Sequence, residues 1–210
     1  MDIVKNQTCE TDSFVREIME FALNKSGLFY TENEDFMRDI TGDAFDFFNA
    51  FYLRPEHVKY PNLRKYSEII KNNEIVAVNN YPLNAFLASQ KITSERRLHL
   101  FFHEIGHATG HENRLNRPRI SKPNNCMKRD LTIEELTVEK SAQILMDHFG
   151  VSTSETKNKS KNYIEHYVFE IAPIEIEFVQ AYTDVKAKQA ARYILENWLN
   201  GFTKQKNKVG

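Results

Sequence analysis

The sequence lacks the features that would direct a protein to a membrane or to the secretory pathway. Two cysteines, Cys9 and Cys126, are too few for a disulfide scaffold, so a reducing compartment is expected. No apolar run approaches the roughly 18 residues that a membrane-spanning helix needs. The first residues contain no basic segment followed by an apolar one, so no secretory signal is expected. These absences predict a cytoplasmic protein without a membrane partner.

The chain also has no large excess of charge of one sign. Its 28 Lys and Arg residues nearly balance 29 Asp and Glu residues, so nucleic-acid binding over the whole surface is not expected. One local exception is residues 113–129, which contain no acidic residue. Its basic residues are Arg114, Arg117, Arg119, Lys122, Lys128 and Arg129. This segment is either a solvated loop or a patch that binds nucleic acid or an acidic protein.

What the chain does contain is the composition of a globular protein. It has 210 residues, of which 41% are hydrophobic, enough for one domain or one domain with an extra N-terminal layer. Residue spacing predicts a helix from Ser13 to Gly27, a strand at 74–79, helices at 94–109 and 132–150, a loop at 152–162, and further helices to Phe202. The aromatic-rich residues 36–52 are expected to form one or two short core helices. The fold class predicted is α+β, rich in helix with a small sheet.

The helix at 94–109 carries the most informative motif. His103 and His107 are four residues apart, so both rings project from one side of the helix and can share one metal ion. Glu104 lies beside the first histidine, where its carboxylate can reach a metal-bound water without being a ligand. Two imidazoles and a general base on an amphipathic helix are typical of zinc hydrolases of the zincin class.

A zinc ion needs a third protein ligand. His111 would lie about 12 Å from His103 along a continuing helix, and can join the pair only if Gly110 turns the chain back. The metzincin pattern would place its third histidine where this chain has Asn113. The third ligand is therefore expected on the next helix.

Two carboxylates fall on the apolar stripe of the helix at 132–150. Glu135 and Glu139 are one turn apart there, and buried carboxylates need partners. We interpret Glu135 as the third ligand and Glu139 as the acceptor that orients a histidine. The alternative is that Thr132 and Glu135 form a capping box, in which Glu135 only satisfies backbone amides.

The two motifs together resemble a known family. Residues 103–111 followed by 114–117, and the helix at 134–139, are similar to the zincin-like metallopeptidase domain of the antirestriction protein ArdC, which is found in conjugative plasmids and in phage polyvalent proteins. The resemblance extends over residues 74–197, and Val138 stands where the family usually has alanine. It implies that His103, His107 and Glu135 bind Zn²⁺ and that Glu104 is the catalytic base.

We expect the chain to have three parts: an N-terminal helical segment at 1–73, the zincin-like domain at 74–202 and a flexible basic tail at 203–210. The expected function is a zinc metallopeptidase of a phage or mobile element, acting on a protein substrate such as a host defence factor. The alternative is a non-catalytic protein on the same fold that binds nucleic acid or a defence protein through residues 113–129. Manganese or cobalt can replace zinc on similar ligands.

Two further expectations concern the substrate. The strand at 75–78 is expected to hold an extended peptide along its edge. Tyr163 and His166 are candidate donors for the developing oxyanion on chemistry alone, with ordinary helix residues as the alternative.

Overall fold

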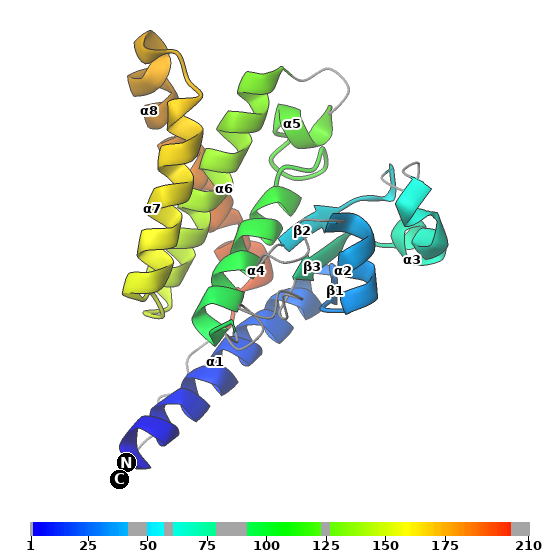
Figure 1. Ribbon diagram of the computed structural model, residues 1–210, viewed down its shortest axis with the longest axis vertical. Coiled ribbons are helices and arrows are strands. Elements are labelled where there is room, and N and C mark those ends of the chain that lie inside the picture. Colours follow the sequence, from blue (N-terminus) through cyan, green and yellow to red (C-terminus); the bar gives the residue numbers. More distant parts are fainter. Residues whose placement is uncertain (1, 42–49, 57–60, 79–91, 123–126, 203–210) are drawn as a thin grey trace.

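A buried helix, α4 (Ser94–Ala108), occupies the centre of the computed structural model. It lies between a small sheet and a group of three long helices, α6 (Lys128–His148), α7 (Ser154–Phe169) and α8 (Ile176–Tyr193) (Figure 1). The structure describes residues 2–41, 50–56, 61–78, 92–122 and 127–202. The expected helix-rich α+β class is confirmed.

The sheet has three strands, β1 (Phe29–Thr31), β2 (Ala50–Leu53) and β3 (Ile75–Val78). Their order is β1-β3-β2, with β1 parallel and β2 antiparallel to β3. The expectation that residues 75–78 offer a free edge to a substrate is therefore wrong, because both edges of β3 are paired. Among the described residues, the sheet edge beside α4 that has no further strand belongs to β2.

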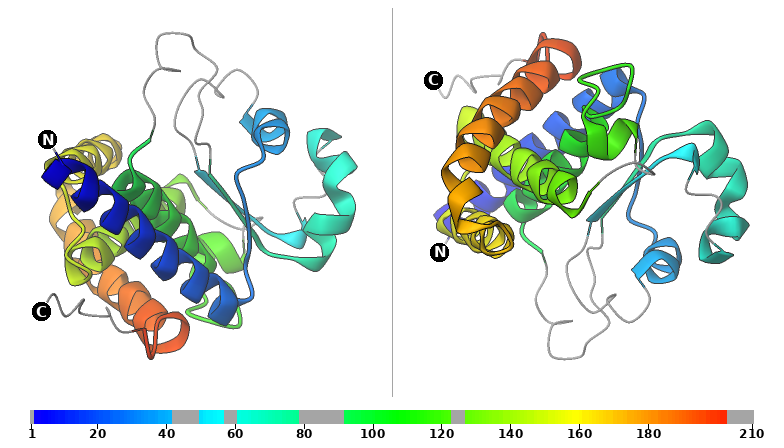
Figure 2. Two further views of the ribbon diagram at one scale, coloured as in Figure 1. Left: turned by 90° about the horizontal axis from the view of Figure 1, so that it is seen from below. Right: turned by 90° about the horizontal axis from the view of Figure 1, so that it is seen from above.

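The central strand is buried on both faces, which explains its uninterrupted apolar sequence. Val76 and Val78 contact the main core, while Ile75 and Ala77 contact a second core on the opposite face. The main core is formed with α1 (Asp2–Ser26), α4, α6 and the π-helical turn η6 (Ile194–Trp198). The second core is formed with α2 (Glu34–Thr41) and α3 (Ser67–Asn72), on the side of the sheet away from α4 (Figure 2). The sheet thus combines β1 and β2, which precede residue 73, with β3, which follows it.

The three long helices form a layer beside α4. Helix α6 packs against both α8 and α4, and α7 packs against α6. The remaining short elements are the 3₁₀ helix η3 (Pro61–Tyr66), the helix α5 (Pro118–Ser121) and the 3₁₀ helix η5 (Pro173–Glu175). Because α6 contacts α4 along its length, side chains on its inner face reach the histidines of α4.

Three elements differ from the sequence prediction. Helix α1 begins near residue 2, and the Ser13 hydroxyl bonds to Glu17 inside it, so Ser13 does not begin the helix. Residues 50–52, expected in a short helix, lie in β2 because their backbone pairs with β3. Residues 154–162, expected as a loop, lie in α7, which begins after the capping side chain of Thr153. Phe45, Phe47, Phe48 and the tail at 203–210 lie outside the described residues.

No helix in the described part of the chain combines the length and the apolar character needed to cross a membrane.

At Gly106, α4 and α6 are in close contact. A Cβ atom at Gly106 would lie 3.1 Å from the Cβ of Val138 and 3.2 Å from the Ser141 hydroxyl oxygen. The Val138 Cβ is fixed to a helix backbone and cannot swing away, so the added methyl group must separate the helices. This outweighs the better helix propensity of alanine.

We predict that Gly106→Ala lowers the free energy of unfolding by about 1–3 kcal/mol, the usual cost of overpacking a core. The loss should be smaller when Val138→Ala is also present, because that substitution restores space at the crossing. Urea unfolding of the four proteins of this double-mutant cycle measures the coupling. Equal losses in both backgrounds would contradict the proposed contact.

Candidate metal centre

Helix α4 presents two imidazoles from one buried face. The Thr93 side chain accepts a hydrogen bond from the Arg96 backbone N–H and starts the helix. Apolar residues such as Phe101 anchor its reverse face in the main core. His103 and His107 are only 7% and 9% exposed, and their ring centroids are 5.0 Å apart. The predicted histidine pair is therefore built as the spacing requires.

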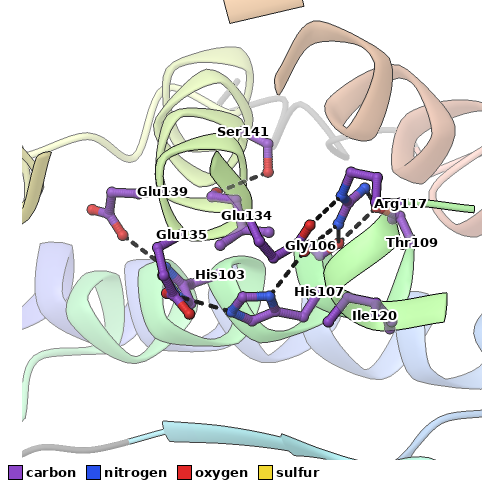
Figure 3. Close-up of polar contacts among 12 residues, drawn as sticks. His103, Gly106, His107, Thr109, Arg117, Ile120, Glu134, Glu135, Glu139 and Ser141 are labelled. Atoms are coloured by element: carbon purple, nitrogen blue, oxygen red, sulfur yellow. Dashed lines mark hydrogen bonds and ion pairs between the residues drawn. The ribbon is translucent and has the colours of Figure 1, made fainter. Parts of the chain in front are cut away.

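Helix α6 supplies a carboxylate to the same point. Glu135 Oε2 lies 3.4 Å from His103 Nε2 and 3.7 Å from His107 Nε2. One ligand atom from each residue lies within 4.8 Å of the other two (Figure 3). Tetrahedral zinc with bonds of about 2.0–2.1 Å separates its ligand atoms by about 3.4 Å. The three side chains thus form a group able to hold a metal ion, and they fit zinc.

Neither the capping-box role of Glu135 nor metal binding by His111 fits the structure. Helix α6 begins at Lys128, where Asp130 accepts the Met127 backbone N–H, so Thr132 lies inside the helix and cannot cap it. His111 follows the end of α4, and its Nδ1 accepts the Asn113 backbone N–H. Among the described residues, His111 does not join the metal-holding group.

Each histidine donates a hydrogen bond from its second ring nitrogen to a buried carboxylate. His103 Nδ1 lies 2.7 Å from Glu139 Oε2, and His107 Nδ1 lies 3.0 Å from Glu134 Oε1. A carboxylate only accepts, so Nδ1 carries the proton and the lone pair of Nε2 is left for a metal. The sequence predicted the Glu139 contact and missed Glu134.

Glu134 is held in turn by a buried arginine. Arg117 Nε lies 2.6 Å from Glu134 Oε2, and its Nη2 lies 2.7 Å from Oε1. Arg117 also donates to the Thr109 hydroxyl and the Gly106 carbonyl, both at 2.7 Å. Burial alone would raise the pKa of Glu134, but Arg117 and His107 hold it at about 2. Arg117 therefore ties the start of α5 to both helices of the site.

Glu104 is placed to act as a base beside the histidines. Its side chain is buried, and burial raises its pKa, with a further contribution from the charge of Glu135. The backbone N–H of Tyr52, on the edge strand β2, donates to the Glu104 carboxylate. A carboxylate with a raised pKa accepts a proton more readily at neutral pH.

The pocket is short of positive charge. Four carboxylates, from Glu104, Glu134, Glu135 and Glu139, face two guanidiniums, from Arg96 and Arg117. With both imidazoles neutral, two negative charges remain. Burial lowers the pKa values of His103 and His107, yet the surrounding carboxylates raise both above the usual range, that of His107 to about 9, so without a metal both imidazoles are protonated at pH 7. A divalent cation would carry the same charge as these two protons, so exchanging the protons for the ion leaves the charge balance unchanged.

Tyr163 on α7 also reaches this centre. Its hydroxyl donates to Glu135 Oε2 at 2.7 Å, and its ring meets that of His103 edge-on at 5.4 Å. Burial and the charge of Glu135 raise the pKa of Tyr163, so its hydroxyl stays protonated and is a donor. His166 is exposed and packs against the ring of Tyr167.

We predict that Arg117→Met lowers the free energy of unfolding of the metal-free protein by about 3–5 kcal/mol, because it removes the guanidinium partner of the buried Glu134 charge and leaves only the contact with His107. Adding Glu134→Gln should recover part of this loss. Because the folded pKa of Glu134 lies below its ordinary 4.5, its ion pair stabilises the fold above that pH and is lost as the pH falls toward 2. Urea unfolding at pH 7 and pH 3 should show the penalty shrinking in acid; a penalty independent of pH would contradict it.

Residues 88–173 match the family model described as zincin-like metallopeptidase. The match spans less than half of the chain and includes α4, α5, α6 and α7. No curated protein and no solved structure matches the chain. The segment that matches the zincin-like metallopeptidase family model is thus the one that carries His103, His107 and Glu135.

Proposed function

We propose that the protein is a zinc-dependent metallopeptidase that hydrolyses peptide bonds through a metal-activated water, with His103, His107 and Glu135 as the ligands. The observation that carries this proposal is the convergence of these three side chains beside the buried carboxylate of Glu104. The family match of residues 88–173 supports the same reaction class.

The residues of the chain would divide the chemistry among them. When bound, zinc supplies a Lewis acid that polarises a carbonyl group and lowers the pKa of water. Glu104 accepts the proton of the attacking water and returns it to the leaving amine. Glu139 and Glu134 keep both imidazoles in the tautomer that offers Nε2. The Tyr163 hydroxyl is a candidate donor to the developing oxyanion, since it lies beside Glu135.

The edge strand β2 is the proposed support for the substrate. It is the outer strand of the sheet on the side of α4, and the Tyr52 N–H already reaches Glu104. An extended peptide paired with β2 would therefore pass beside the proposed base.

The biological setting rests on the resemblance to ArdC and the phage polyvalent proteins. We propose that the enzyme belongs to a phage or another mobile element and cleaves a host defence protein in the cytoplasm.

The alternative, a binding role for the basic residues 113–129, has weaker support. Arg114 pairs with Glu74 and Arg117 with Glu134. The other two ion pairs are Lys128 with Glu170 and Arg129 with Glu175. Four of the six cations thus have carboxylate partners within the protein, which leaves less positive charge for a nucleic acid.

We predict that Glu104→Gln reduces peptide hydrolysis by about 100- to 10,000-fold, the usual contribution of a general base, and leaves zinc binding intact. Cleavage of a proteome-derived peptide library, followed by mass spectrometry, measures the activity, and metal analysis measures the zinc. Glu68→Gln, an exposed glutamate on α3, is the matched control and should retain full activity. Undiminished hydrolysis by Glu104→Gln would refute the assignment of the base.

We also predict that Glu135→Ala loses bound zinc, because two imidazoles alone leave the ion short of protein ligands. Metal analysis of the purified variant beside the unmodified protein tests this. Retention of one zinc per chain by the variant would show that another group is the third ligand.

A further inference from the structure

His99 is a buried imidazole to which the proposed reaction gives no role. It lies on α4, one turn before His103, and its side chain is 1% exposed. Arg96, His99 and His103 follow one another at spacings of three and four residues, so they share one face of the helix. Glu139 of α6 lies opposite this face and contacts both imidazoles.

The contacts of His99 define which ring nitrogen carries its proton. Arg96 Nη1 lies 2.7 Å from His99 Nδ1. A guanidinium only donates hydrogen bonds, so Nδ1 accepts and the ring proton is on Nε2. His99 Nε2 is buried, lies 3.2 Å from Glu139 Oε1, and makes no regular hydrogen bond among the described residues. Glu139 is thus the carboxylate within ion-pair distance of the proton on Nε2.

Glu139 is thus held between two imidazoles. One oxygen faces His99 Nε2, and the other accepts from His103 Nδ1 at 2.7 Å. In the corresponding position at His107, Glu134 is held directly by Arg117 through two hydrogen bonds. The carboxylate beside each histidine of the site thus also contacts a second group, Arg117 at Glu134 and, at Glu139, His99, which is itself bonded to Arg96.

We propose that Arg96 and His99 are positioning residues of the metal centre. They fix Glu139 so that it accepts the Nδ1 proton of His103 and leaves His103 Nε2 free for the ion. This inference rests on the proposed zinc site, and it adds two residues that act on it through Glu139.

The tautomer of His99 can be read directly in the unmodified full-length protein. Long-range ¹H–¹⁵N correlation spectra of its imidazoles distinguish a proton on Nε2 from a proton on Nδ1. We expect His99 to carry its proton on Nε2, with and without zinc. A proton on Nδ1 would overturn the proposal.

Zinc affinity, measured by competition with a chromophoric chelator, tests the consequence. Outer partners of metal-binding histidines usually change metal affinity about 10- to 100-fold, so His99→Phe, which removes the donor, should weaken zinc binding by about tenfold or more. His99→Gln offers an amide N–H near the position of Nε2 and should retain most of the affinity. A merely structural role would not separate these two variants in this way. Equal affinity of His99→Phe and the unmodified protein would overturn the proposal.

A second variant and a control keep the test decisive. If His99→Phe does not fold, Arg96→Met removes the group that sets the tautomer, and unchanged zinc affinity in that variant would overturn the proposal. The control is Thr137→Val on α6, which removes a buried hydroxyl that has no partner among the described residues. It should leave zinc affinity unchanged. Should the unmodified protein bind no zinc, the proposed function itself fails, which is distinct from a zinc-binding protein that is indifferent to His99.

Discussion

The crossing of α4 and α6 is the constraint on which the rest of the site depends. Helix α4 alone offers two imidazoles, and α6 adds the third candidate ligand and both carboxylates that orient the imidazoles. These contacts require the helices to approach as closely as they do at Gly106, where a side chain would meet Val138. The chemistry of the site is therefore set by backbone distance as much as by the identity of the ligands.

Burial gives this site both its strength and its cost. Carboxylates removed from water are unfavourable unless donors or cations compensate them. Here the compensation is arranged around each imidazole, by Arg117 on one side and by Arg96 with His99 on the other. With both imidazoles neutral, a residual negative charge remains that a divalent cation would balance. The same arrangement also accounts for much of the polar interior of the protein.

Sequence reasoning succeeded where the signal was local. The spacing of His103 and His107 sets their geometry within one helix, and the apolar stripe of α6 correctly indicated that Glu135 faces inward. Glu134 was missed because its partner Arg117 belongs to another element, and no periodicity connects them. Strand β2 was misassigned because its pairing with β3 is a long-range contact, and α7 because it buries polar residues, Thr156 and Ser160, in place of an apolar stripe.

The hydrogen bond from Tyr52 to Glu104 has a consequence for how small the working protein can be. The matched family segment starts at residue 88. The proposed base, however, accepts a hydrogen bond from the backbone of β2, and Arg114 forms an ion pair with Glu74. An excised fragment of residues 88–173 would keep every candidate ligand and lose both of these supports. The N-terminal third of the chain is thereby a structural part of the proposed catalytic unit, and a minimal fragment that keeps both supports must include the sheet.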